Sequence, residues 1–258
     1  MALYFAMALT HTPFVPTPDE PDASGKMGQH KAMVRYTDKL VGRLVDALDT
    51  IGIRDRTIVI FTTDNGTTGG ITGTLDGRKV KGGKAKEIEA GTCVPFIVNG
   101  PGLVPAGVVN DALTDFTDLL PTFVKLAGGT VPDDLDVDGM SIAPLILGKA
   151  QDSEREWIMA MGHHPARLDK KGVCGKQDFA TRVIRDKRYK VWVSSKKQIF
   201  RLHDLKADPW EEHNLIDSGK DAHKQALAKF QAVLDTLPDN DARPLYEPRP
   251  ANPWDRSG

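Results

Sequence analysis

The sequence contains few of the features that mark specialised classes of protein. Only two of its 258 residues are cysteine, Cys93 and Cys174, and neither belongs to a CxxC pair. A zinc site built on thiolates and a disulfide framework are therefore both disfavoured. No apolar run approaches the roughly 20 residues that a membrane-spanning helix needs. These absences leave an ordinary globular protein, whose compartment the cysteine count does not fix.

Net charge is also lacking, because 34 basic residues nearly balance 35 acidic ones and give a formal charge of −1. This balance removes any electrostatic argument for binding nucleic acid or an anionic membrane surface. Apolar residues make up 40% of the chain and charged residues 27%, which is typical of a globular protein. The length allows one large domain or two smaller ones.

Helical and strand patterns alternate in the first part of the chain. Apolar residues three or four apart predict a helix over 27–51. Continuous apolar runs predict buried strands over Thr57–Thr63 and Val94–Val98. The apolar stretch Met1–Leu9 predicts another buried strand, with a short signal-peptide core as the alternative. These elements predict an α/β fold with a mostly parallel central sheet flanked by helices.

From Trp157 the pattern changes to that of a smaller α+β subdomain. Alternating residues over 180–186, 188–194 and 198–204 predict an antiparallel meander, with Lys190 on its solvent-facing side. An amphipathic pattern predicts a last helix over 221–237. We therefore divide the chain into two domains, residues 1–150 and residues 151–258.

The end of the Thr57–Thr63 run is the first candidate site. Asp64 and Asn65 follow the predicted strand at once and place a carboxylate and an amide oxygen side by side. In open α/β sheets, ligands bind outside the carboxyl ends of strands. Two hard oxygen donors at such a place favour a hard divalent cation. The alternative is a plain Asp-Asn-Gly turn without a ligand.

Seven further motifs occur in one characteristic order. They are His11-Thr-Pro-Phe-Val-Pro, Asp38-Lys-Leu-Val-Gly-Arg-Leu, Arg56-Thr-Ile-Val-Ile-Phe-Thr-Thr-Asp-Asn-Gly66, Lys81-Gly-Gly-Lys84, Glu89-Ala-Gly-Thr-Cys-Val-Pro95, Thr114-Asp-Phe-Thr-Asp-Leu-Leu-Pro-Thr122, and the C-terminal signature from Leu202 to Leu215. As an ordered set covering about Leu3 to Leu215, they resemble the formylglycine-dependent sulfatases of the alkaline-phosphatase superfamily. The resemblance makes residues 1–150 the C-terminal part of the catalytic α/β domain.

The resemblance implies roles for four residues. Asp64 and Asn65 match the family's second pair of metal ligands, usually to one calcium ion. Lys84 matches the lysine that contacts the sulfate, and His11 matches the histidine that faces the ester oxygen. Each role suits the residue type, because a lysine supplies a point charge to an anion and a histidine can protonate a departing alcohol. The neighbouring Lys79, Lys81 and Lys86 are the alternatives to Lys84 on this loop.

Two parts of the family's machinery have no match in this sequence. The family nucleophile is a formylglycine made in a Cys/Ser-x-Pro-x-Arg motif, but Cys93-Val94-Pro95 is followed by Ile97 at the arginine position. We therefore interpret Cys93 as a small core residue. The first pair of metal-binding aspartates is absent upstream of His11, and Asp133-Asp134 lies too late in the chain to replace it.

The expected function is hydrolysis of a sulfate ester by a metal-dependent enzyme, of which this chain is the C-terminal half. The implied partner is a small-molecule or carbohydrate sulfate ester, with no nucleic acid and no membrane span. We expect the chain by itself to lack sulfatase activity and to be poorly stable. The resemblance favours export to the periplasm or out of the cell.

Two other functions are left open. A phosphonate or phosphate ester hydrolase has the same fold, although a two-metal phosphatase of the superfamily typically has an Asp-His pair where Asn65-Gly66 stands. A truncated product that folds or binds a partner without catalysis is the other. The roles of His163 and His164, as pocket residues, metal ligands or structural residues, also stay open, while His203 and His213 are interpreted as structural.

Overall fold

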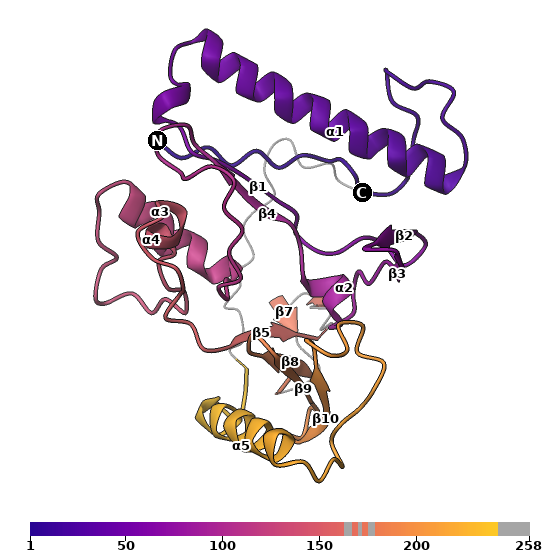
Figure 1. The fold of residues 1–258 in the computed structure, drawn as a ribbon, viewed down its shortest axis with the longest axis vertical. Helices are drawn as coiled ribbons and strands as arrows, with labels where there is room; N and C mark the ends of the chain where they lie inside the picture. The colour runs from indigo at the N-terminus through magenta and orange to yellow at the C-terminus, as the bar shows by residue number, and fades with distance from the viewer. Residues whose placement is uncertain (163–166, 170–171, 175–178, 242–258) are drawn as a thin grey trace. The chain divides into compact units, whose positions relative to one another are not determined.

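The computed structural model describes residues 1–162, 167–169, 172–174 and 179–241. The chain divides into two compact units (Figure 1). The first unit comprises residues 1–84 and 88–158, and the second comprises residues 85–87 and 159–258. No helix in the described residues is both long and apolar enough to cross a membrane. The predicted division into domains at residue 150, with its functional assignments, stays a prediction.

The first unit begins with a long helix, α1 (Gly25–Thr50), which confirms the helix predicted over 27–51. Its buried residues Ala32, Met33 and Thr37 lie on one face. On its outer side Arg35 donates to Glu20 at 2.7 and 2.5 Å. Gly52 follows in the left-handed region with φ of 71°, which is a conformation that glycine adopts at no steric cost. The short 3-10 helix η1 (Arg54–Arg56) then leads into the first strand.

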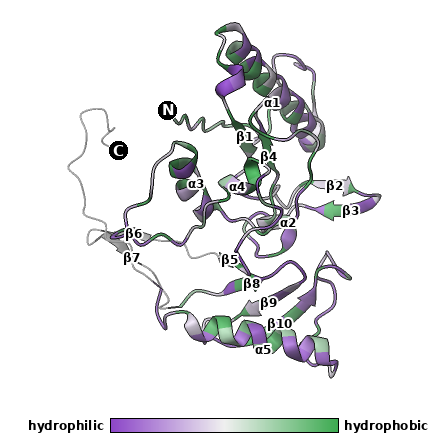
Figure 2. Cartoon of the chain, turned by 60° about the vertical axis from the view of Figure 1, so that its left-hand side comes forward, coloured by the Kyte–Doolittle hydropathy of each residue, from purple (hydrophilic) through white to green (hydrophobic). Residues whose placement is uncertain are grey.

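Strands β1 (Val59–Thr62) and β4 (Phe96–Asn99) form an antiparallel pair, with Phe61 opposite Ile97. Both strands are largely hydrophobic (Figure 2). The mostly parallel sheet that we predicted is not present among the described strands. The connection between β1 and β4 contains only a hairpin and a one-turn helix. A parallel partner needs a crossover, usually a longer helix, that carries the chain back to the same edge.

Two predicted burial patterns in the first unit were wrong. The stretch Met1–Leu9 forms no strand, and Leu3 and Tyr4 are exposed. Cys93 is exposed too, and β4 buries only one of its faces, because Ile97 is 57% exposed. An apolar run becomes buried only where a neighbouring element covers it, and in the described residues none covers these positions on both sides.

The remaining elements of the first unit lie around this strand pair. The hairpin β2 (Thr72–Leu75) and β3 (Arg78–Lys81) turns at Asp76 and Gly77, whose φ values are 49° and 77°. Such a two-residue turn matches the twist of a hairpin. Helix α2 (Glu89–Thr92) precedes β4. A 3-10 turn η2 (Phe116–Asp118), then α3 (Leu119–Leu126) and α4 (Ala143–Ile146), complete the unit. The side chain of Asp115 caps η2.

The second unit is built on a four-stranded sheet in the order β10-β9-β8-β5. Its strands are β5 (Ile158–Met161), β8 (Arg182–Arg185), β9 (Tyr189–Val193) and β10 (Ile199–Asp204), and β8-β9-β10 form the predicted antiparallel meander. Helix α5 (Asp221–Thr236) contacts β9 and β10. A two-stranded pair, β6 (Arg167–Asp169) and β7 (Gly172–Cys174), lies within the same unit.

The core of the second unit lies between α5 and one face of this sheet. Ile184, Val191 and Leu202 from the strands are fully buried, as are Phe230 and Leu234 from α5. These positions alternate along the strands and recur three to four apart on the helix, as the sequence predicted. The opposite face was predicted to meet water, which is wrong at Lys190, because this side chain is fully buried against Glu211.

Candidate functional site

The candidate site is a turn, Asp64–Gly66, that follows β1 directly. Asp64 is exposed and Asn65 is half-buried. The amide Nδ2 of Asn65 donates to Oδ1 of Asp64, and the hydroxyl of Thr63 donates to the carbonyl of Asn65 at 3.2 Å. The hydrogen bond between the two side chains leaves Oδ2 of Asp64 and Oδ1 of Asn65 outside it. The turn therefore offers two neighbouring hard oxygen atoms, and their role as metal ligands stays a prediction.

Three glycines hold the turn against the segments that follow it. The amide of Gly66 donates to the carbonyl of Gly91 at 2.9 Å. A Cβ at Gly66 would lie only 2.0 Å from the carbonyl oxygen of Ala90, and one at Gly83 would lie 2.6 Å from the amide of Gly91. A Cβ at Gly82 would lie 2.1 Å from the carbonyl oxygen of Thr68. Only glycine permits these backbone approaches.

The same backbone contacts bring the loop of Lys84 to the Asp64 turn. The amide of Lys84 donates to the carbonyl of Thr67 at 3.0 Å. Thr67 lies three residues after Asp64 in the chain. The amide of Gly82 donates to the carbonyl of Ile71 at 2.9 Å, which closes the base of the hairpin. Lys84 is half-buried. The backbone thus joins three of the four predicted site residues in one loop cluster.

His11 lies on the N-terminal segment and is exposed. Its ring nitrogen Nδ1 lies 2.6 Å from the carbonyl oxygen of Thr12, to which it must donate, and its amide donates to the carbonyl of Ala8 at 3.0 Å. With Nδ1 engaged in this way, Nε2 is the atom left to face a substrate oxygen. These hydrogen bonds of His11 are local, so its convergence with Asp64, Asn65 and Lys84 stays a prediction.

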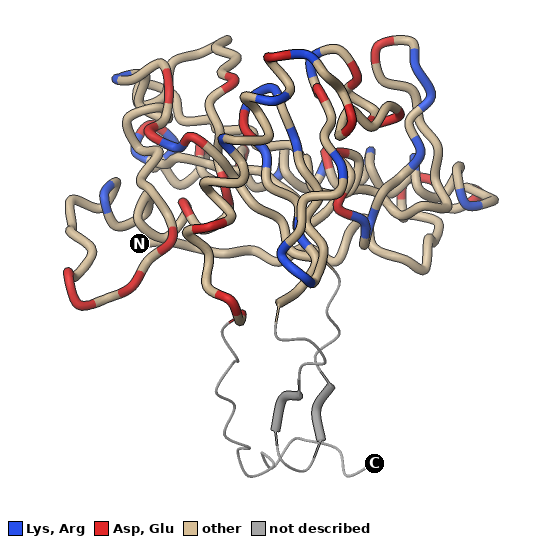
Figure 3. Tube along the Cα trace, turned by 90° about the horizontal axis from the view of Figure 1, so that it is seen from below, with Lys and Arg blue, Asp and Glu red and all other residues tan. Residues whose placement is uncertain are grey.

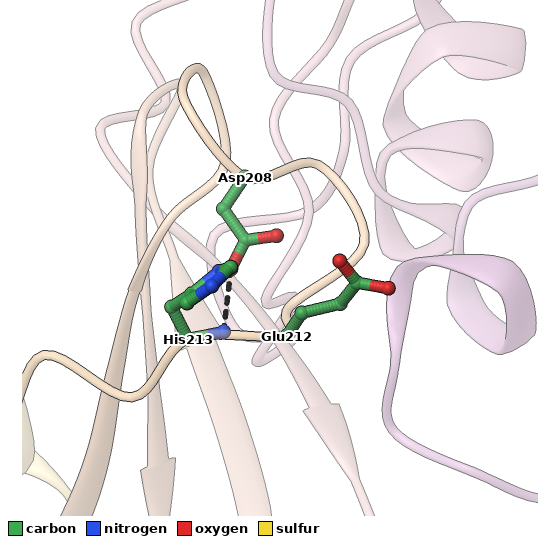
Figure 4. Close-up of side chains that lie close together, drawn as sticks. All are labelled: Asp208, Glu212 and His213. Atoms are coloured by element: carbon green, nitrogen blue, oxygen red, sulfur yellow. Dashed lines mark hydrogen bonds and ion pairs between the residues drawn. The ribbon is translucent and has the colours of Figure 1, made fainter.

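A second group suited to a cation lies in the second unit, on the turn after β10 (Figure 4). Asp208, Glu212 and His213 each offer one ligand atom, and these atoms lie within 4.8 Å of one another. Burial raises the pKa of Asp208, but backbone hydrogen bonds from His213 and Glu212 outweigh it and hold that pKa below its usual value. The sequence indicates a structural role for His213. The spacing of an acid at 208, an acid at 212 and a histidine at 213 was the available signal.

The predictions for His163 and His164 fall outside the described residues. Charged residues of both signs are spread along the described chain (Figure 3), as the balanced composition implies. Some of the ion pairs contain a side chain that is buried or nearly so. Arg155 pairs with the fully buried Asp118, and Arg182 pairs with Asp241 at 2.6 Å.

Comparison with known proteins decides the family. A model of the family described as Sulfatase matches residues 2–129, and one described as N-sulphoglucosamine sulphohydrolase, C-terminal, matches residues 86–239. The chain belongs to the sulfatase family. The two matches overlap over residues 86–129 and together cover residues 2–239. They confirm the resemblance that the ordered motifs carried.

Curated sulfatases match different lengths of this chain. Steryl-sulfatase of Homo sapiens is 36% identical over 146 residues, which are 53% of this chain and 25% of the relative. Arylsulfatase A of Bos taurus is 29% identical over 252 residues, which are 87% of this chain and 46% of the relative. The chain thus spans about a quarter to a half of the length of these relatives.

Solved sulfatase structures support the fold. A protein solved in complex with its substrate D-glucosamine-2-N,6-O-disulfate is 26% identical to this chain, with a TM-score of 0.62. The match covers 84% of this chain and 45% of that one. This sulfatase chain therefore has an alkaline-phosphatase-like α/β fold, followed by the antiparallel sheet of the second unit.

Proposed function

We propose that the protein of which this chain is part hydrolyses sulfate esters, with the Asp64 turn and the Lys84 loop forming part of its active site. The observation that supports the proposal is the backbone hydrogen bond from Lys84 to Thr67, because it joins the loop of Lys84 to the turn that carries Asp64 and Asn65. A sulfate ester presents an anion that both groups can hold. Family membership supports the reaction type.

The donor set at Asp64 and Asn65 fits a calcium ion. A carboxylate and an amide oxygen are the ligands that Ca²⁺ takes in proteins, but it takes six to eight oxygen atoms. Bound there, the ion would neutralise charge on the sulfate oxygens. Two ligands from this chain give only weak binding, with a dissociation constant on the order of millimolar. The ion's identity is part of the proposal.

The side chains of this chain have two proposed roles in the reaction. The ammonium group of Lys84 holds a sulfate oxygen and balances its charge as the ester bond breaks. The Nε2 atom of His11 faces the bridging oxygen. In the imidazolium form, with Nδ1–H still donating to Thr12, it transfers its Nε2 proton to that oxygen as the alcohol leaves, and the ring becomes neutral. No Cys/Ser-x-Pro-x-Arg motif occurs in residues 1–258, so the chain itself provides no formylglycine nucleophile.

The proposed substrate is a sulfated sugar. A relative of known structure binds D-glucosamine-2-N,6-O-disulfate as its substrate, and the second family model is named for N-sulphoglucosamine sulphohydrolase. We also propose that β1 and β4 belong to a larger, mostly parallel sheet in the full-length protein. The solved relative is about twice as long as the segment that matches it, which supports this view.

Calcium binding tests the metal site directly. Titration calorimetry of the chain with CaCl₂ should give weak heat, and CaCl₂ should raise the melting temperature. Asp64→Asn should abolish both effects, whereas Asp76→Asn should leave them unchanged. Asp76 is a matched control because it is an exposed carboxylate of the same unit with φ of 49°, which asparagine tolerates. If calcium binding released as much heat in Asp64→Asn as in the unsubstituted chain, Asp64 would not be a calcium ligand.

Sulfate binding tests Lys84 separately. Glucosamine 6-sulfate, titrated with calcium present and followed by NMR, should shift the amide signals of residues 64–68 and 84. Lys84→Ala should remove these shifts, and Lys26→Ala, on an exposed lysine of α1, should retain them. Shifts that persist in Lys84→Ala would assign sulfate binding to another group. A parallel titration with a phosphonate monoester distinguishes the two ester classes.

A further inference from the structure

The hairpin β2–β3 stands out because it is exposed along its whole length and carries a run of cations. All four residues of β2 are exposed, and on β3 only Val80 is partly covered. The hairpin contains Arg78, Lys79 and Lys81 and a single acidic residue, Asp76, at its tip. It leads directly into the Lys84 loop. This basic surface is unusual in a chain whose formal charge is −1.

The pairing register sorts these side chains onto two faces. Thr72 lies opposite Lys81, and Thr74 lies opposite Lys79. Cross-strand partners point to the same face of a hairpin, and alternate residues share that face. One face therefore carries Lys79, Lys81, Thr72 and Thr74, while Arg78 and Val80 lie on the other. We call the first group the Lys79–Lys81 face.

The cations of this face are not neutralised within the described part of the chain. Neither Lys79 nor Lys81 has an ion pair with any described residue. Alternate residues of a strand lie roughly 7 Å apart, so the two ammonium groups repel each other. An anion bound between them would relieve this repulsion. The threonine hydroxyls beside them can donate hydrogen bonds to the oxygens of the same anion.

The hairpin is held at a fixed place next to the proposed sulfate site. Its base is closed by the hydrogen bond from Gly82 to Ile71, and Ile71 is only 5% exposed. The close backbone approach of Gly82 to Thr67 and Thr68 fixes the same end. Lys81 thus lies three residues before Lys84 on a chain segment that has little freedom. A ligand held at Lys84 can extend along the hairpin.

We propose that the Lys79–Lys81 face is an anion-binding surface for a sulfated saccharide chain that carries further sulfate or carboxylate groups beside the ester to be cleaved. The inference rests on the proposed function for the identity of the site at Lys84. Its own observations are two cations without an ion pair in the described part of the chain, their shared face and the anchored base of the hairpin. The hairpin has no aromatic side chain on which a nucleic-acid base could stack, and this favours a saccharide over a single-stranded nucleic acid.

The test compares ligands that differ in the number of anionic groups. A fully sulfated heparin-type tetrasaccharide and glucosamine 6-sulfate are titrated into the full chain by calorimetry. Lys79→Gln/Lys81→Gln should weaken tetrasaccharide binding about tenfold, because two exposed charge contacts are lost. The same variant should leave glucosamine 6-sulfate binding unchanged. Lys26→Gln/Lys31→Gln, which removes two exposed lysines from α1, should bind both ligands like the unsubstituted chain.

The outcomes separate this inference from the proposed function. Equal tetrasaccharide affinity in the hairpin variant and the α1 variant would overturn the inference, as would a lack of tetrasaccharide binding at millimolar concentration. Loss of tetrasaccharide affinity in the hairpin variant with no effect of Lys84→Ala on either ligand would support the surface and contradict the proposed function. A single-stranded oligonucleotide that binds as tightly as the tetrasaccharide would overturn the assignment to a saccharide.

Discussion

Lys190 and Asp118 are the two fully buried charged side chains that the structure describes. The Nζ atom of Lys190 lies 3.0 Å from Oε1 of Glu211, and the Glu211 side chain is only 3% exposed. A buried charge is tolerated only when a partner compensates for the loss of water. The sequence could not show this, because Glu211 lies far from Lys190 in the chain and the strand pattern alone places Lys190 on the outer face.

Removing the cation should therefore destabilise the second unit strongly. Lys190→Met removes the cation that pairs with the buried Glu211 carboxylate and should lower the free energy of unfolding by about 3 kcal/mol. Urea denaturation followed by circular dichroism measures this loss. Lys190→Met/Glu211→Gln should recover much of the loss, and Lys196→Met, at an exposed lysine of the same unit, should change little. If Lys190→Met were as stable as Lys196→Met, Lys190 and Glu211 would not form a buried ion pair.

His203 makes stability depend on pH in a predictable direction. It is 2% exposed, and neither ring nitrogen has a hydrogen-bond partner among the described residues. Burial lowers its pKa below 6.5, although the charges of Glu211 and Asp208 act to raise it. The unfolded chain therefore binds a proton near pH 6.5 while the folded chain does not yet do so. Stability is complete above that pH and is lost as the pH falls towards the folded pKa.

The expected result is a lower free energy of unfolding at pH 5.5 than at pH 7.5, measured in urea. His203→Gln should reduce this difference, since glutamine does not titrate. His213→Gln, at an exposed imidazole, should preserve it. Burial also lowers the pKa of His30 in the first unit, so part of the difference should remain in His203→Gln. If the free energy of unfolding of His203→Gln differed between pH 5.5 and pH 7.5 as much as that of the unsubstituted chain, His203 would be excluded as a titrating group.

At the scale of elements, the Asp64 turn depends on its glycine contacts more than on its side chains. Gly66→Ala places a methyl group where the carbonyl of Ala90 lies, at a distance of 2.0 Å. The turn must then move away from α2, at a cost of about 2 kcal/mol in the free energy of unfolding. Urea denaturation measures this loss of stability. The heat of calcium binding, measured by titration calorimetry, should also be smaller in Gly66→Ala.

Gly70→Ala is the matched control, because a Cβ at Gly70 meets nothing within 4 Å. Gly70 lies in the same loop, and a glycine-to-alanine substitution reduces the backbone entropy of the unfolded chain equally at both positions. Equal stability of Gly66→Ala and Gly70→Ala would mean that α2 and the turn do not pack as described. The contact between Gly66 and Gly91 depends on a chain reversal that no local sequence pattern encodes.

Element types were largely predictable because they depend on local periodicity. α1 and α5 carry apolar residues three to four apart, and β8, β9 and β10 alternate. The observed elements match these expectations closely. Strand pairing was harder to predict from the sequence, since β1 and β4 are antiparallel where a parallel sheet was predicted. Pairing direction depends on how the intervening residues 63–95 fold, and their glycine-rich sequence fits several paths.

At the scale of the whole molecule, residues 1–258 contain no match to the formylglycine motif. The purified chain, with calcium, should therefore release no alcohol from an aryl sulfate or an aryl phosphonate. A chromogenic ester assay measures this, with a formylglycine-bearing arylsulfatase as the positive control. Turnover that disappears in Lys84→Ala would show that another nucleophile in this chain acts at the proposed site.

By itself, the sequence determined the family, the types of most elements and the residues that offer hard oxygens and cations, because each of these depends on residues close together in the chain. Only the tertiary structure decided that β1 and β4 run antiparallel, that Lys190 is buried against Glu211, and that Lys84 joins the Asp64 turn through Thr67. These features depend on contacts between residues distant in sequence, and their direction and burial are fixed by packing rather than by local pattern.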